Sequence, residues 1–120
     1  MDVIKTAADA LKPISDEGIT VQQGWYDASL KKLHITLWKL RDYAAAHSDD
    51  DCDVEAATIQ VNIWSTADQQ DLVKRVKKLM KANGFEFTEG NDTGEPDTGV
   101  FMNAMRFFYQ EEAEEEETEE

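Results

Sequence analysis

The clearest pattern of hydrophobic and polar positions lies in residues 54–84, VEAATIQVNIWSTADQQDLVKRVKKLMKANG. Its first half alternates apolar and polar residues, which is the period of two expected of a strand with one buried face. The apolar members of this alternation are Ala57, Ile59, Val61 and Ile63. The second half spaces its apolar residues so that they form one stripe on a helix. These are Leu72, Val73, Val76, Leu79 and Met80. The pattern predicts a strand that leads directly into an amphipathic helix covering a sheet.

Both ends of this predicted helix carry capping residues. Thr66 and Gln69 have the spacing of a capping box, in which two side chains satisfy N–H groups at the start of a helix. Ser65 is an alternative cap. At the other end, Asn83-Gly84 supplies a residue that readily enters the left-handed conformation. The sequence therefore predicts a helix that begins near Thr66 and ends at Asn83.

Shorter patterns predict the other elements. Residues 2–12 have apolar side chains at helical spacing, and Pro13 is expected to end this helix because it biases the preceding residue away from the helical region. Strands are predicted at residues 19–22, 33–41, 85–88 and 100–109, the last inside the sheet. The acidic centre of residues 43–57 is expected to be the tip of a long hairpin, and residues 90–99 a mobile connection.

Together these patterns predict an α+β fold: a mostly antiparallel sheet of about five strands with two helices packed on one face. With 120 residues the chain has the length of one domain, which we place at residues 1–110. Residues 111–120, EEAEEEETEE, contain eight glutamates. Such a segment cannot bury apolar surface and repels itself, so it is expected to be a disordered acidic tail.

The net charge of −14 argues against nucleic-acid phosphates or an anionic membrane as the main partner. The eight glutamates of the tail account for much of this charge and leave −6 for the rest of the chain. The single cysteine, Cys52, cannot close an intrachain disulfide. No stretch resembles a signal peptide or a membrane span, so we expect a protein made and kept in a cytosol.

Aromatic residues give the main indication of self-association. The predicted strand at residues 33–41 has apolar side chains on both faces. One face can meet the helices, which leaves the other, with Trp38 and a neighbouring Trp64, for another subunit or for solvent. Trp25 and Tyr26 either close the edge of the core or contact a partner.

The sequence lacks the residue patterns of a catalytic or metal site. His34 lies in a predicted strand, where a structural or surface imidazole is expected, and His47 lies in the acidic loop with Cys52. The cluster Asp49–Asp53 does not have the ligand spacing of an EF-hand, because Val54 and Gln60 fall where Gly and Glu are required. Glycine-rich phosphate loops are missing too. We therefore predict no catalytic, cofactor-binding or metal-binding residues, no cofactor, and a protein that is not an enzyme.

The predicted long helix carries a basic face on an acidic protein. Its members are Lys74, Arg75, Lys77, Lys78 and Lys81. This face is either a solvated surface that complements the helix terminus or an attachment site for an acidic neighbour, such as the acidic loop or tail of another copy. Nucleic acid is the third choice, since no aromatic residues interleave with the lysines.

Several of these segments in order resemble the tail-terminator, or tail-to-head joining, proteins of long-tailed bacteriophages and prophages. The likeness spans about residues 3–109 and rests on LKPI, ITVQQGWYD, TIQVNIWSTADQQDLVKRVKKLMKANGFEF and DTGVFMNAMRFFY. It implies an α/β subunit that forms a ring, usually hexameric, on the end of the tail tube. That ring stops tube polymerisation and docks the head connector. The acidic tail is not explained by the family pattern.

This resemblance implies a structural virion protein of the tail or neck, present in the host cytoplasm during assembly. Its partners would be other copies of itself, the tail tube protein and the head connector or stopper protein, with DNA only passing through the channel. A channel wall should be acidic or neutral, since lysines would trap the phosphate backbone. Lys74, Lys78 and Lys81 are therefore expected to face outward or toward other subunits.

Two alternatives stay open. A head-completion or stopper protein of the same neck region has similar requirements. A small acidic inhibitor that imitates DNA belongs to a different class, and the net charge of −14 suits it. Mimicry would require carboxylates spread over the folded surface, whereas the sequence concentrates them in a loop and a tail.

Overall fold

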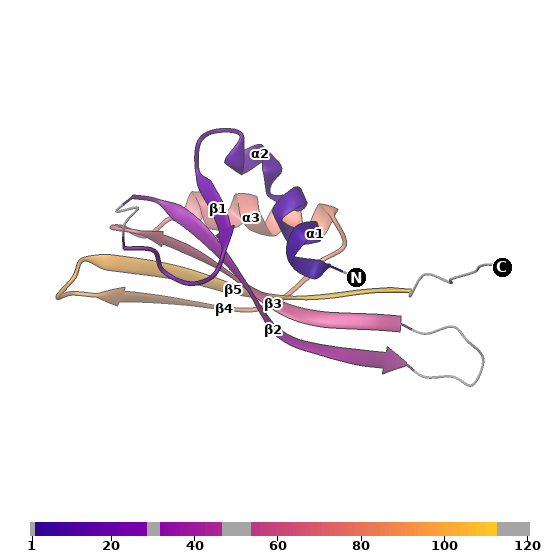
Figure 1. Cartoon of the computed structure of the whole chain (residues 1–120). Coiled ribbons are helices and arrows are strands. Elements are labelled where there is room, and N and C mark those ends of the chain that lie inside the picture. Colours follow the sequence, from indigo (N-terminus) through magenta and orange to yellow (C-terminus); the bar gives the residue numbers. More distant parts are fainter. Residues whose placement is uncertain (1, 29–31, 47–53, 113–120) are drawn as a thin grey trace.

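The computed structural model describes residues 2–28, 32–46 and 54–112. In chain order these form α1 (Val3–Ala10), α2 (Lys12–Ser15), β1 (Thr20–Gln23), β2 (His34–Ala46), β3 (Val54–Ser65), α3 (Gln70–Ala82), β4 (Glu86–Glu95) and β5 (Val100–Glu112). The five strands make one sheet in the order β1-β2-β3-β5-β4. Figure 1 shows the three helices on one side of this sheet. The α+β class and the five strands agree with the prediction.

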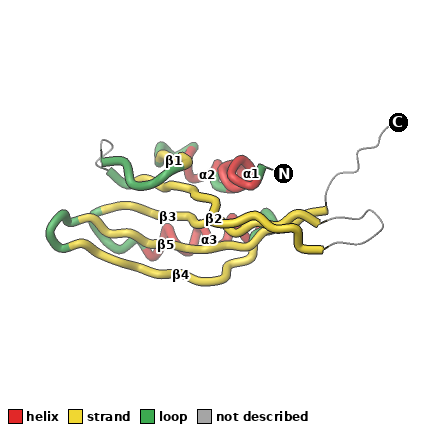
Figure 2. The backbone as a smooth tube through the Cα atoms, turned by 60° about the horizontal axis from the view of Figure 1, so that its bottom comes forward, coloured by secondary structure: helices red, strands yellow, loops and turns green. Residues whose placement is uncertain are grey.

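The sheet is mixed: it is mostly antiparallel, as predicted, but one edge pairing is parallel, which the sequence did not indicate. β1 pairs with β2 in the parallel direction, and the other three pairings are antiparallel. A parallel pair cannot be joined by a tight hairpin, so the chain must return to the same end of the sheet before β2 begins. Figure 2 shows β1 and β4 at opposite edges of the sheet.

One apolar core lies between the helices and the sheet. β3 contributes Ile59, Val61 and Ile63, all fully buried, as the alternating pattern predicted. Val76 and Met80 of α3 are also fully buried, in the same cluster. Further members come from α1, α2, the residue between them, β2 and β5: Val3, Ala7, Ala10, Leu11, Ile14, Ile35, Leu37, Met105 and Phe107. Because these side chains all belong to one cluster, every helix covers the same face of the sheet.

The N-terminal helical region has two helices where one was predicted. α1 ends at Ala10, and the short α2 begins at Lys12 with Pro13 in its first turn. Proline is tolerated there because N–H groups in the first turn have no partner within the helix. Pro13 therefore starts a second helix after the chain bends at Leu11, and the described residues hold three helices.

The start of α3 also differs from the prediction. The helix begins at Gln70, and its N-cap residue, Gln69, makes no side-chain capping bond. Instead, the buried side chain of Asn103 in β5 accepts a hydrogen bond from the backbone N–H of Gln69 at 3.0 Å. The Asn103 amide nitrogen donates to Asp68 at 3.0 Å and to Asp92 at 2.9 Å. The helix is thus capped by a strand residue far away in sequence, which a local capping motif cannot reveal.

The end of α3 agrees with the prediction. Asn83 is the C-cap residue. The next residue, Gly84, has a φ of +91°, in the left-handed region that favours glycine. Gly84 also lies against the ring of Tyr109, where a Cβ atom would come within 3.3 Å of Cε1. Glycine at this position therefore ends the helix and leaves room for the aromatic side chain.

Most strands are longer than predicted. β2 continues to Ala46 and β5 to Glu112, and Glu111 pairs with Glu55 of β3. β4 runs from Glu86 to Glu95, so the expected connection at residues 90–99 is mostly a strand. Its residues are all exposed, which is why apolar alternation did not reveal it. Backbone pairing with β5, in register from Glu89 onward, makes it a strand.

Some predictions concern residues outside the described part of the chain. These are the acidic cluster Asp49–Asp53, His47 and Cys52 in the predicted hairpin tip, and residues 113–120 of the predicted tail.

Replacing Asn103 with alanine should lower the free energy of unfolding by about 1–3 kcal/mol, because the partly buried N–H of Gln69 loses its acceptor and Asp68 and Asp92 lose a donor. Urea denaturation measures the change. The matched control is Thr93→Ala on exposed β4, which should change the stability by less than about 0.5 kcal/mol. Equal effects of the two substitutions would contradict the capping role.

Candidate self-association surface

The sheet face turned away from the helices, here called the open face, carries side chains that alternate with the core residues. Its members on the central strands follow from the register of β2, β3 and β5. They are Thr36, Trp38, Gln60, Asn62, Trp64, Met102, Ala104 and Arg106. Because the three helices pack on the other face, this surface is the largest part of the sheet without a covering layer of helices.

Aromatic side chains between β1 and β2 cover one end of the open face. The ring of Trp64 lies 5.4 Å from that of Trp25 and 5.1 Å from that of Tyr26, measured between centroids. Trp64 is consequently only 7% exposed. The expectation that Trp64 faces a partner or solvent is therefore wrong, since the same chain covers it. Trp25 itself is 52% exposed, so it forms the solvent-facing side of this aromatic cluster.

His34 fixes the position of this covering segment. The backbone N–H of Asp27 donates to Nε2 of His34 at 3.3 Å, so Nε2 carries no proton. The proton must then reside on Nδ1, which lies 2.8 Å from the carbonyl oxygen of Lys32 and donates to it. The buried imidazole also stacks on Tyr26 at 5.7 Å between centroids. These contacts agree with the structural role expected for His34.

A chain of hydrogen bonds begins beneath the aromatic cluster. The indole N–H of Trp64 donates to the hydroxyl of Thr36 at 2.9 Å. The same hydroxyl accepts from the amide of Asn62 at 3.4 Å, and the Asn62 oxygen accepts from Gln60 at 2.7 Å. Thr36 and Asn62 are fully buried and Gln60 nearly so. Buried polar groups with partners cost little stability and hold their neighbours in one geometry.

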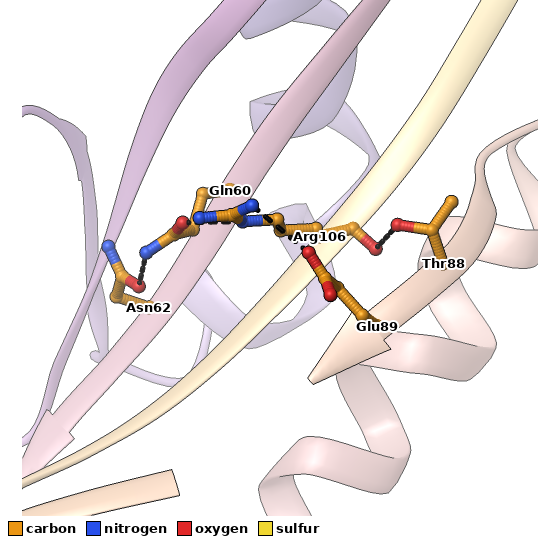
Figure 3. Close-up of polar contacts among 5 residues, drawn as sticks. All are labelled: Gln60, Asn62, Thr88, Glu89 and Arg106. Carbon is orange, nitrogen blue, oxygen red and sulfur yellow. Dashed lines mark hydrogen bonds and ion pairs between the residues drawn. The ribbon is translucent and has the colours of Figure 1, made fainter. Parts of the chain in front are cut away.

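The hydrogen-bond chain continues toward the exposed edge of the sheet (Figure 3). Nε of Arg106 donates to the Gln60 oxygen at 3.1 Å, and Nη1 pairs with Glu89 of β4 at 3.0 Å. The hydroxyl of Thr88 donates to the carbonyl oxygen of Arg106 at 3.2 Å. The polar chain therefore crosses from β2 to β4 and neutralises the positive charge of Arg106 with a carboxylate.

A shallow groove of about 580 Å³ lies over this polar chain. It is lined by Gln60, Glu89, Gly90, Asn91, Met102, Ala104 and Arg106. The two charged groups in it pair with each other, and the lining contains neither a histidine nor a nucleophilic serine or cysteine. Such a lining provides hydrogen-bonding groups for a protein surface but no nucleophile and base. Among the described residues, no three His, Cys, Asp or Glu side chains gather into a metal-binding group.

Exposed apolar side chains lie toward the two sides of the sheet. On β2, Trp38 is 45% exposed and Leu40 is 39% exposed. Trp38 is thus accessible, as expected for a residue left to a partner or to solvent. On β4, Phe87 is 40% exposed, and the amino group of Lys77 lies 4.2 Å from its ring centroid.

The basic face of α3 divides into two groups. Arg75 makes two hydrogen bonds to the carboxylate of Glu17, at 3.0 and 2.8 Å. Lys77 packs on Phe87. The other group, Lys74, Lys78 and Lys81, is exposed along one side of the helix and is here called the lysine stripe. The stripe therefore faces outward in the single chain, as expected.

The ion pair with Arg75 changes the acid–base behaviour of Glu17. The hydrogen bonds from Arg75 lower the pKa of the Glu17 carboxyl below its ordinary value, outweighing desolvation, and the positive charge adds a smaller effect in the same direction. The same hydrogen bonds raise the pKa of Arg75.

The described part of the chain holds no helix with the length and apolar character that a bilayer crossing requires.

Comparison with known proteins gives a structural likeness only. No protein-family model matches the sequence, and no curated protein matches it. Among solved structures, the fold is similar to a chain in the virion of a native gene transfer agent particle. The two superpose with a TM-score of 0.63 at 11% sequence identity, over 92% of this chain and 94% of that chain. The chain thus shares a fold with a virion component over nearly the whole length of both.

The polar chain on the open face was not recognised from the sequence. Gln60 and Asn62 occupy the polar positions of an alternating strand, which indicated a solvated face. Their hydrogen-bond partners are distant in sequence: Thr36 is 26 positions from Asn62, and Arg106 is 46 positions from Gln60. The only local signal was the choice of amides and a tryptophan, rather than lysine or glutamate, at those positions.

Replacing Glu17 with glutamine should lower the thermal midpoint at pH 7 slightly, because an exposed ion pair contributes little. The lowered pKa of Glu17 means that the pair stabilises the fold above the ordinary value of 4.5, and that this is lost as the pH falls through the lower folded value. The wild-type and variant midpoints should therefore converge in acid. Thermal unfolding monitored by circular dichroism between neutral pH and about pH 3 tests this. Arg75→Gln should reproduce the effect, and Lys74→Gln should not.

Proposed function

We propose that this protein is a structural component of a phage-like virion, and specifically the tail terminator. In this role copies form a ring, a hexamer in the family that the sequence resembles, on the end of the tail tube. The ring stops tube polymerisation and joins the tail to the head connector. The observation that carries the proposal is the fold shared with a gene transfer agent virion chain over 92% of this protein. The protein would reside in the tail or neck of the virion, after assembly in the host cytoplasm.

The surface chemistry of the described residues supports a role without catalysis. The groove over the polar chain contains amides, glycine and one ion pair, which do not form a nucleophile with a base. Exposed Trp38 and Leu40 offer apolar contact area instead. A ring subunit needs such contact surfaces for its neighbours, for the tube protein and for the connector, and it needs no active site.

The charge distribution suits a channel through which DNA passes. The lysine stripe lies on α3, on the helix side of the sheet. On the open face, Arg106 is paired with Glu89. By its register with β5, β4 adds three carboxylates to this face, Glu86, Glu89 and Glu95, and no lysine or arginine. A wall of this composition would repel the phosphate backbone weakly rather than bind it.

Electron microscopy of tails made with and without this protein tests the role. Without a terminator nothing limits addition at the free tube end, so we expect overlong tubes in its absence and tubes of defined length when it is restored. Tubes of normal length that fail to join heads would instead indicate the head-completion or stopper role. Tubes of unchanged length that still join heads would overturn the proposal.

Deleting residues 113–120 distinguishes the terminator from a DNA mimic. β5 ends at Glu112, so this deletion spares every strand. Tail length should stay controlled, because the contact surfaces described above lie in residues 2–112. A mimic that relies on the acidic tail would lose its inhibition of a host nucleic-acid enzyme on the same deletion. The measurements are tail length by electron microscopy and inhibition of purified nucleases and polymerases, with circular dichroism as the folding control. Loss of length control in a folded variant would contradict the expectation.

A further inference from the structure

We infer that neighbouring copies of this chain join through their sheet edges, with β4 of one copy pairing in the antiparallel direction with residues 38–46 of β2 in the next. The sheet would then continue from subunit to subunit around the ring. The closure of that ring rests on the proposed function, whereas the junction itself requires only two copies.

β4 is one of the two edges. It is the last strand in the order β1-β2-β3-β5-β4, so only its inner side has a strand neighbour among the described residues. All ten of its residues are exposed, although its partner β5 contributes Met105 and Phe107 to the core. A long exposed edge strand presents a row of backbone donors and acceptors that can pair with another strand.

The second edge is the distal half of β2. β1 pairs only with His34–Leu37, since the register runs from Thr20 opposite His34 to Gln23 opposite Leu37. Beyond Leu37, the described chain places a strand on only one side of β2, which is β3. Trp38 and Leu40, two of the most exposed apolar side chains of the protein, lie at the start of this section. Both edges are about nine or ten residues long, so each can accommodate the other.

The strand directions favour a head-to-tail junction. β2, β3, β5 and β4 alternate in direction, so β4 runs opposite to β2 within one chain. A rotation about an axis near the strand direction preserves the direction of every strand. The β4 strand of one copy therefore meets β2 of the next as an antiparallel pair, which is the more stable kind. This contact joins two different surfaces, as ring formation requires.

Charge selects the mixed pair over pairing of like edges. β4 has four carboxylates and no cation, so two β4 edges would place like charges opposite each other. The start of the β2 section instead carries Lys39 and Arg41, with one carboxylate, Asp42, which pairs with Lys39 at 2.8 Å. Two β2 edges would bring these cations together. β4 against β2 instead places a strand with four carboxylates beside a section whose described charges sum to a positive value, so the edges discourage a two-fold dimer and favour the head-to-tail contact.

The offset between the two edges fits a closed sheet. Through the registers, Glu89 lies level with Trp38 within one chain. β1 occupies the β2 edge at residues 34–37, so β4 of the next copy must lie beyond it, beside residues 38–46. Relative to a copy at the same level, this is a shift of about five residues, or roughly 17 Å along the strands. Four strands span about 19 Å across the sheet. The ratio of the shift along the strands to the width of the four strands corresponds to a strand tilt of about 40° from the barrel axis. This tilt is within the range of roughly 35–45° found in closed barrels.

This junction decides which face lines the ring. A sheet that closes on itself has more room on its outer side, so the helices lie outside and the open face lines the bore. The lysine stripe of α3 then faces away from passing DNA. Of the polar chain, the bore would be lined by its exposed end, where Arg106 is neutralised by Glu89.

Disulfide trapping tests the junction in a Cys52→Ser background. Asn91→Cys places a thiol near the middle of β4 on the open face. Trp38→Cys and Arg41→Cys place thiols on the same face of the β2 section, and Leu40→Cys places one at the register shift between them. Opposite residues of an antiparallel pair are close enough to form a disulfide. We expect a mixture of Asn91→Cys with at least one β2 variant to shift into disulfide-linked dimers on a non-reducing gel, while each variant alone stays monomeric. Lys5→Cys on exposed α1 is the matched control and should not cross-link with either.

The experiment is carried out on assembled tails and on concentrated free protein. Linked dimers of one variant alone, Asn91 to Asn91 or Leu40 to Leu40, would overturn the head-to-tail junction. Tails of controlled length without any linkage between β4 and β2 would also overturn it, and would leave the proposed function standing. Linkage in a protein that has no effect on tail length would support the junction and reject the tail-terminator role. Absence of both linkage and length control would reject both.

Discussion

The pairing of β3 along its whole length with β2 on one side and β5 on the other is the interaction on which the rest of the structure depends. It fixes the register of three long strands from Val54 to Ser65. Because side chains alternate between the two faces of a strand, this register also decides which residues reach the core and which reach the open face. A slip of one residue would place Gln60 and Asn62 under the helices and Val61 in the groove.

Polar side chains then connect parts of the chain that the apolar core does not hold in position. Asn103 ties the start of α3 to β5 and β4, and Arg106 ties β5 to Gln60 and Glu89. The Asn103 bonds lie on the helix side of the sheet, and the Arg106 bonds lie on the open face. Satisfied networks of this kind favour one arrangement over alternatives. A sheet with a polar face, and with edges that lack a second strand neighbour among the described residues, suits a subunit whose contacts with neighbours must repeat identically.

The predictions failed where the deciding partner was distant in sequence. In place of the expected capping box at Thr66 and Gln69, the buried amide of Asn103 in β5 accepts a hydrogen bond from the N–H of Gln69. Trp64 was expected to face a partner, but Trp25 and Tyr26 return over it after β1. β4 was predicted as a short strand because its side chains are polar, and only the backbone of β5 shows that residues up to Glu95 continue the sheet.

The sequence by itself determined what depends on local periodicity: the alternating core positions of β3, the apolar stripe of α3 with its end at Asn83 and Gly84, and the α+β class. The same local composition gave the strong acidity of the chain. Only the tertiary structure decided the parallel pairing of β1, the polar chain across the open face and the two edges that have no second strand neighbour in the described part of the chain. Pairing between strands is made by backbone groups that every residue carries, so side-chain patterns do not record which edge meets which neighbour.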